Sequence, residues 1–133
     1  MTDDPGFRIV GSDTVADVGF LQLTEEHVQA PDGEDLTRYV VRHLGAVVVV
    51  PVDETGEGAW LVRQYRVATR GNLLELPAGK RDVDGEAPAE TARRELGEET
   101  GYSPGRLVKL AEFYNSPGFC DEYTHLYLSL IHI

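Results

Sequence analysis

The first third of the chain alternates apolar and polar residues in short segments separated by turn-forming residues. Segments 7–15, 19–29 and 36–43 are therefore expected to be strands. The second and third of these flank 30–34, a stretch rich in Pro, Asp and Gly, which predicts a β-hairpin. We expect residues 1–43 to form a small antiparallel sheet of their own.

The rest of the chain begins with a different pattern, a continuous and mostly β-branched apolar run at 46–50. Such a run is typical of a strand that is covered on both faces. Further strands are expected from Trp60 onwards and over 107–114 and 123–130.

The segment 87–100 has the composition of a helix and carries residues typical of helix ends at both of its ends. Pro88 suits a first helical turn, and Gly101 suits the position just after a helix ends. Strands, then a helix, then strands predict an α+β fold, a mixed sheet with a helix packed on it, in a domain covering 44–133.

Composition narrows the functional classes. The chain has 133 residues, 41% of them hydrophobic, and a net charge of −11. This acidic balance argues against nucleic acid as a partner, because phosphate backbones are bound by clustered Lys and Arg. No apolar run is long enough to span a membrane, and there is a single cysteine, so a cytoplasmic location is expected.

Three glutamates gather in the predicted helix. Glu95 and Glu99 are four residues apart and share a face, and Glu98 lies nearby. Like charges at this spacing cost roughly 0.2–0.5 kcal/mol per pair, which Arg94 or a divalent cation would offset. Taken alone, the pattern also fits an ordinary solvated face with surface ion pairs.

The context of these glutamates resembles the Nudix family. Its box reads Gx5Ex7REUxEExGU, where U is a bulky apolar residue. The chain matches it with Gly79, Glu86, Arg94, Glu95, Leu96, Glu98, Glu99, Gly101 and Tyr102. Six residues rather than five separate Gly79 from Glu86, an insertion that falls in a loop and leaves the helical register intact.

The resemblance implies an α/β/α sandwich and hydrolysis of pyrophosphate bonds with Mg²⁺ or Mn²⁺. By position in the box, the implied metal ligands are Glu95, Glu98, Glu99 and the carbonyl of Ala78, in a loop expected over 76–79. Arg94 is implied to hold the glutamates in place, and Glu86 to brace the loop.

Three flanking features follow the box pattern: 63–66 leading into 75–79, 116–122 with Pro117 15 residues beyond Tyr102, and Arg42 just before 45–47. These features resemble the ADP-ribose pyrophosphatase branch, and the resemblance extends from about Leu36 to Tyr127. That branch implies a homodimer with exchanged N-terminal strands. It implies that Arg66 contacts a substrate phosphate and that Arg42 and Glu122 contact substrate from the neighbouring subunit. Read without the family, each of the three is also an ordinary solvent-facing residue.

The resemblance therefore predicts hydrolysis of ADP-ribose to AMP and ribose 5-phosphate. One alternative is another nucleoside diphosphate sugar, because sugar choice rests on a few pocket contacts. A second is a Nudix-fold module that senses a ligand without hydrolysing it.

The end of the chain prompts a separate expectation. Residues 128–133 read LSLIHI, which a transposon-end adapter of sequencing libraries also encodes; a native strand with this sequence is the alternative. The Nudix domain is expected to be incomplete at its C-terminus, with the general base of the branch lying beyond it. The chain itself is therefore expected to be only weakly active.

Overall fold

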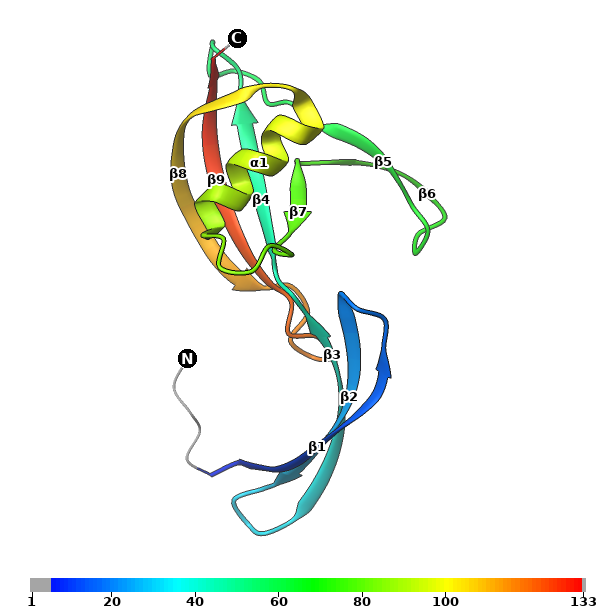
Figure 1. Cartoon of the computed structure of the whole chain (residues 1–133). Coiled ribbons are helices and arrows are strands. Elements are labelled where there is room, and N and C mark those ends of the chain that lie inside the picture. The colour runs from blue at the N-terminus through cyan, green and yellow to red at the C-terminus, as the bar shows by residue number, and fades with distance from the viewer. Residues whose placement is uncertain (1–5, 133) are drawn as a thin grey trace. The chain divides into compact units, whose positions relative to one another are not determined.

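The computed structural model describes residues 6–132, which form two compact units (Figure 1). The first unit takes the residues up to Leu44 together with Tyr114–Glu122. The second takes Gly45–Phe113 together with the residues from Tyr123. Each unit contains its own β-sheet.

The first unit is a three-stranded antiparallel sheet in the order β1-β2-β3. Its strands are β1 (Arg8–Asp17), β2 (Leu21–Gln29) and β3 (Asp35–His43). The turns between them use Gly19 and Gly33, whose φ angles of 87° and 88° suit a residue without a side chain. The predicted N-terminal antiparallel sheet and its hairpin are confirmed.

A loop from the far end of the sequence completes the first unit by packing against β3. Val41 donates its amide hydrogen to the Phe119 carbonyl at 2.7 Å, and Asp121 donates to the Val41 carbonyl at 3.1 Å. The loop over 115–122 therefore belongs with the N-terminal sheet, although 71 or more residues separate them in sequence.

The second unit is built on a four-stranded sheet in the order β7-β4-β9-β8. The strands are β4 (Ala46–Val52), β7 (Ala78–Lys80), β8 (Ser103–Tyr114) and β9 (Tyr123–His132). β4 pairs antiparallel with β7 and parallel with β9, so the sheet is mixed as predicted. A separate hairpin is formed by β5 (Val62–Arg66) and β6 (Gly71–Glu75).

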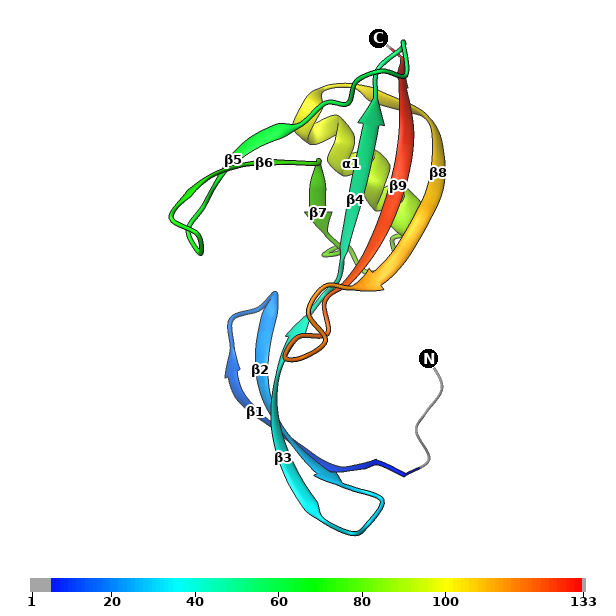
Figure 2. The ribbon, with the colours of Figure 1, turned by 180° about the vertical axis from the view of Figure 1, so that it is seen from behind.

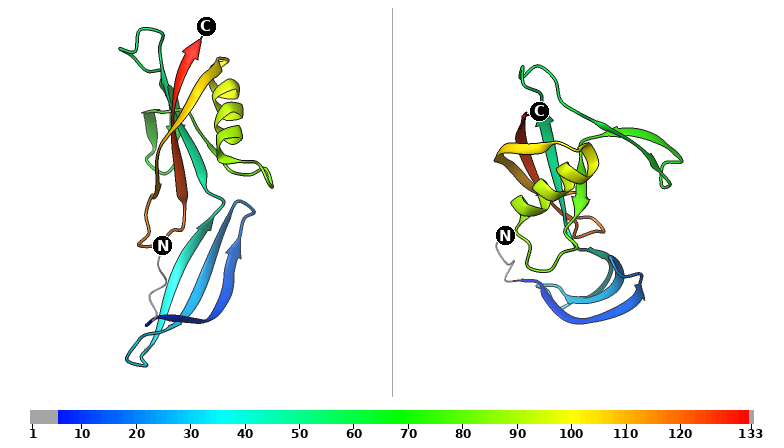
Figure 3. Two further views of the ribbon diagram at one scale, coloured as in Figure 1. Left: turned by 90° about the vertical axis from the view of Figure 1, so that its left-hand side faces the viewer. Right: turned by 45° about the horizontal axis from the view of Figure 1, so that its top comes forward.

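The helix α1 (Pro88–Thr100) covers one face of this sheet, as Figures 1, 2 and 3 show from different sides. Its buried residues Ala92 and Leu96 pack with Val47 and Val49 of β4 and Tyr127 of β9. The helix ends where Gly101 adopts φ 74° and donates its amide hydrogen to the Gly97 carbonyl. The α+β fold and the single predicted helix are confirmed.

Three local expectations need correction. Residues 76–79 are not all loop, because Ala78 and Gly79 form the short strand β7 against β4. The hairpin β5–β6 contains a strand, β6, that the residue pattern did not predict. In the described part of the chain β4 is fully buried on one face only, with Val48 and Val50 half-buried on the other.

Within residues 6–132, no helix is both long and apolar enough to cross a membrane. Of the last six residues, Leu128 to His132 continue β9, and Ile133 lies outside the described residues.

Candidate active site

The carboxylates of α1 that face the sheet lie against strand β7. Glu95 occupies space directly over Gly79, where an added Cβ would come within 2.0 Å of the Glu95 carboxyl carbon. Four residues further on, Glu99 accepts a hydrogen bond from the Ala78 amide to its Oε2 at 3.2 Å. The helical spacing therefore brings both carboxylates to the two residues that open β7.

Burial of these two carboxylates has an electrostatic cost. Burial is the main cause that raises the pKa of Glu95, and the nearby charge of Glu98 raises it further. Burial likewise raises the pKa of Glu99, with a contribution from the charge of Glu95. A partly desolvated group of negative charges favours any cation that can approach it.

The guanidinium of Arg94 supplies the positive charge that balances these carboxylates. Its Nη2 lies 3.1 Å from Glu86 Oε1 and its Nε 3.3 Å from Glu86 Oε2, a bidentate pair. Its Nη1 lies 3.0 Å from Glu95 Oε1 and 3.5 Å from Glu98 Oε2. Hydrogen bonding to Arg94 is the main cause that lowers the pKa of Glu86. The loop with one additional residue thus still brings Glu86 to Arg94.

The oxygen atoms of the three helix glutamates are not gathered into one closed ligand set. Among residues 6–132, the group whose ligand atoms all lie within 4.8 Å of one another is Asp13, Glu25 and His27, on β1 and β2. His27 Nε2 lies 3.0 Å from Asp13 Oδ2 and 3.4 Å from Glu25 Oε1, as in an exposed ion pair. In the helix, by contrast, Arg94 occupies the position between Glu95 and Glu98.

Arg66, at the end of β5, is paired with Glu75 on the neighbouring strand β6. Its Nε and Nη2 donate to the two Glu75 carboxylate oxygens at 2.8 Å and 2.7 Å. This bond is the main cause that raises the pKa of Arg66, and the charge of Glu99 also raises it. Arg66 therefore lies within the electrostatic reach of the helix carboxylates.

Arg42 and Glu122 both belong to the first unit. Arg42 Nη2 lies 2.7 Å from Glu26 Oε1, and its Nη1 lies 3.3 Å from Asp121 Oδ2. Glu122 Oε1 lies 3.7 Å from the His43 ring. The structure thus divides the predicted residues into two sets, one around α1 with Arg66 and one on β3 and the loop over 115–122.

Comparison with known proteins decides the family. The model of the NUDIX domain matches residues 41–132, which is more than half of the chain. The chain belongs to the Nudix family. The resemblance drawn from the box residues is confirmed.

Several proteins with established names are similar to this Nudix chain. An ADP-ribose pyrophosphatase of Bacillus subtilis (strain 168) is 43% identical over 109 residues, covering 82% of this chain and 58% of the relative. An ADP-ribose pyrophosphatase of Mycobacterium tuberculosis (strain ATCC 25618 / H37Rv) is 40% identical over 123 residues, covering 92% of this chain and 59% of the relative. The chain thus spans somewhat under three fifths of the length of these relatives.

The fold has a solved counterpart in a crystal structure of an ADP compounds hydrolase. The TM-score is 0.80 at 23% identity, with 96% of this chain and 69% of the other covered. At that identity the likeness establishes the Nudix fold.

The sequence pattern missed the acidic partners of Arg66 and Arg42. Glu75 pairs with Arg66, and Glu26 and Asp121 pair with Arg42. Alternation gave no signal for Glu26, because Leu21 and Leu23 lie on the opposite face of β2 from Thr24 and Glu26, the two residues that the structure buries. A charged residue at such a position is rare unless it is paired.

Proposed function

We propose that this Nudix chain hydrolyses the pyrophosphate bond of ADP-ribose with a divalent cation, Mg²⁺ or Mn²⁺, giving AMP and ribose 5-phosphate. The observation that carries the proposal is the packing of Glu95 and Glu99 against Ala78 and Gly79. The relatives named above, ADP-ribose pyrophosphatases at 40% and 43% identity, support the substrate.

The residues around α1 fit a divalent cation. Hard cations prefer carboxylate and carbonyl oxygens, and Glu95, Glu98, Glu99 and the Ala78 carbonyl supply them. Gly79 leaves the space that Glu95 fills, so a side chain at that position would displace a ligand. When bound, the cation neutralises pyrophosphate oxygens and lowers the pKa of an attacking water.

Arg94 is proposed to hold the carboxylates of Glu95 and Glu98 in position for the cation, through the contacts described above. Because Glu86 anchors Arg94 from the loop side, the guanidinium is fixed at both ends. In the overall reaction, the water oxygen forms a bond to one phosphorus, and the bridging oxygen leaves with the other phosphate.

Substrate contacts are proposed for Arg66, Arg42 and Glu122. A guanidinium suits phosphate because its N–H groups match two oxygens at once. Arg66 is supported by its electrostatic coupling to Glu99. Arg42 and Glu122 are proposed to act on substrate bound by a second copy of the chain.

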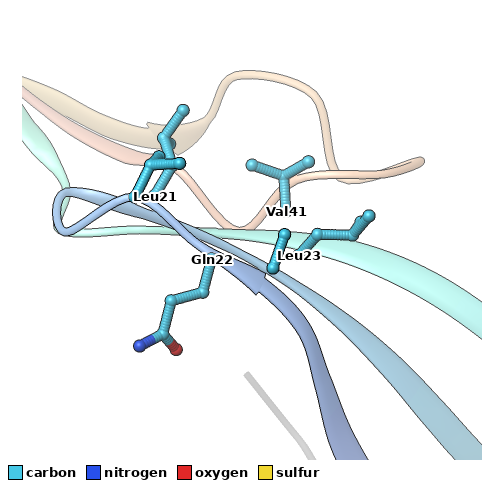
Figure 4. Close-up of a pocket in the computed structure, with 6 residues that line it drawn as sticks. Leu21, Gln22, Leu23 and Val41 are labelled. Atoms are coloured by element: carbon cyan, nitrogen blue, oxygen red, sulfur yellow. The ribbon is translucent and has the colours of Figure 1, made fainter.

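A homodimer is part of this proposal. The N-terminal unit has an apolar hollow whose labelled lining residues include Leu21, Leu23 and Val41, with Gln22 pointing away from them (Figure 4). Large hydrophobic side chains are also exposed on β1 and beside it, such as Ile9 at 65% and Val18 at 66%. Exposed apolar surface of this kind supports association with another protein surface.

The test is product analysis by liquid chromatography and mass spectrometry. The parent chain with ADP-ribose and Mg²⁺ or Mn²⁺ should give equal amounts of AMP and ribose 5-phosphate, and EDTA should stop the reaction. Glu99→Gln should lose most turnover, whereas Glu90→Gln should not, because Glu90 is exposed and pairs with Arg93 on the same helix.

Two results would redirect the proposal. Cleavage of another nucleoside diphosphate sugar in preference to ADP-ribose would move it to that substrate. Binding of ADP-ribose without any AMP at saturating divalent cation would support a sensing module instead.

A further inference from the structure

The small N-terminal sheet buries a carboxylate that the proposed reaction does not use. Glu26 on β2 is 4% exposed. Its Oε1 accepts hydrogen bonds from Thr24 Oγ1 at 2.6 Å, Ser12 Oγ at 3.0 Å and Arg42 Nη2 at 2.7 Å. Three donors from three strands therefore converge on one oxygen atom, which fixes the position of the carboxylate.

The same contacts fix the guanidinium of Arg42. Its Nη1 donates to Asp121 Oδ2 at 3.3 Å, while Asp121 Oδ1 accepts the His43 amide hydrogen at 2.7 Å. The Arg42 bonds to Glu26 and Asp121 use two of the five N–H groups that a guanidinium carries. The Arg42 side chain is 40% exposed, whereas that of Glu26 is 6% exposed. Arg42 is thus anchored from the interior and presents its other donors outwards.

Stability alone gives little reason to bury this pair. The desolvation of two charges offsets most of their attraction, and well-packed apolar residues often serve a sheet as well or better. Hydrogen bonds from Thr24 and Arg42 lower the pKa of Glu26 to about 2, so the carboxylate stays charged at neutral pH. What the pair does supply is one fixed orientation of a cationic side chain.

We propose that Glu26 is a positioning residue, which orients the Arg42 guanidinium for an anionic group of the substrate. The inference rests on the proposed function, and specifically on substrate contact by Arg42. Glu26 does not touch the substrate; it acts through Arg42, with Thr24 and Ser12 holding its carboxylate in place.

The experiment is steady-state kinetics on ADP-ribose, with calorimetric binding of ADP-ribose to the same variants. Glu26→Gln keeps the size of the side chain and removes its charge. It should raise KM about tenfold, equivalent to about 1.4 kcal/mol, while kcat stays within about twofold of the parent. Glu25→Gln is the matched control, because Glu25 contacts His27 and Tyr39 instead of Arg42. Its KM should equal that of the parent.

A double-mutant cycle separates positioning from a purely structural role. In an Arg42→Met background, Glu26→Gln should raise KM no further, because the group that it orients is gone. A structural role would instead lower the Tm in both backgrounds and leave KM unchanged. If Glu26→Gln does not fold, Glu26→Asp serves: it keeps the charge but retracts the carboxylate by one methylene, and KM should rise in the same Arg42-dependent way.

The outcomes distinguish the two proposals. A parent that hydrolyses ADP-ribose, with KM unchanged in folded Glu26→Gln or Glu26→Asp, overturns the positioning role alone. An equal rise in KM with and without Arg42 also overturns it. A parent that neither hydrolyses nor binds ADP-ribose overturns the proposed function, and this inference with it.

Discussion

Gly79→Ala is a sharp probe of the site, because one methyl group would act on one carboxylate. Built on the existing backbone, the new Cβ lies 2.0 Å from Glu95 Cδ and 2.4 Å from both Cγ and Oε1. Ordinary contact begins near 3.4 Å, so the Glu95 carboxyl carbon has to move by about 1.4 Å. The atoms in the way belong to a flexible side chain, and the Gly79 φ is not in the left-handed region.

This geometry predicts a small change in stability and a large change in rate. Moving Glu95 to another rotamer costs roughly 1 kcal/mol, so the variant should fold with a Tm within a few degrees of the parent. A displacement of about 1 Å in a catalytic group can lower the rate about a hundredfold. Gly79→Ala should therefore retain stability and lose about 99% of kcat on ADP-ribose.

The assay couples AMP and ribose 5-phosphate to a phosphatase and measures phosphate, alongside thermal unfolding. Gly118→Ala is the control for a glycine substitution as such, because a Cβ there meets nothing within 4 Å and the φ is ordinary. In a Glu95→Ala background the methyl group at position 79 should have no further effect. Near-parent turnover by folded Gly79→Ala would refute the placement of Glu95 in the metal site.

Three further predictions concern charged side chains. Arg94→Met should lower the Tm by about 3–6 °C, roughly 1–2 kcal/mol, because Glu86 and the helix glutamates lose the cation that they share. Arg93→Met should change the Tm little. Equal Tm values for the two variants would contradict this prediction. Ionised Glu26 contributes stability above its ordinary pKa of 4.5, and that contribution is lost as pH falls towards its pKa of about 2. Denaturant unfolding of Glu26→Gln should accordingly vary less with pH over this window, and an acid limb as steep as that of the parent would count against it. Arg66→Ala should raise KM for ADP-ribose about tenfold without changing the fold, and an unchanged KM would remove it from the substrate contacts.

Local patterns were enough to predict most of the elements. Pro88 and Gly101 bracket the helix because their backbone preferences act within a single turn. The hairpin of β2 and β3 followed from the turn at 30–34 in the same way. The box predicted that Glu95 and Glu99 share a face, and the helix places both against β7.

Features that depend on distant pairing were not predictable in this way. The three residues of β7 form a strand by pairing with β4, a contact that their own composition does not predict. The acidic partners of Arg66 and Arg42 were missed for the same reason, since Asp121 lies 79 residues from Arg42. Charged residues that pair only in the folded chain leave no periodic pattern in the sequence.

The central claim, that the glutamates of α1 hold a divalent cation, is tested most directly by Mn²⁺ binding followed by electron paramagnetic resonance. The parent chain should remove free Mn²⁺ signal, and Glu99→Gln should weaken binding about tenfold or more. Two control variants should bind Mn²⁺ as the parent does. They are Glu90→Gln, on the exposed side of the helix, and Asp13→Asn, in the group of Asp13, Glu25 and His27. Unweakened binding by Glu99→Gln, or loss of binding by Asp13→Asn instead, would contradict the account.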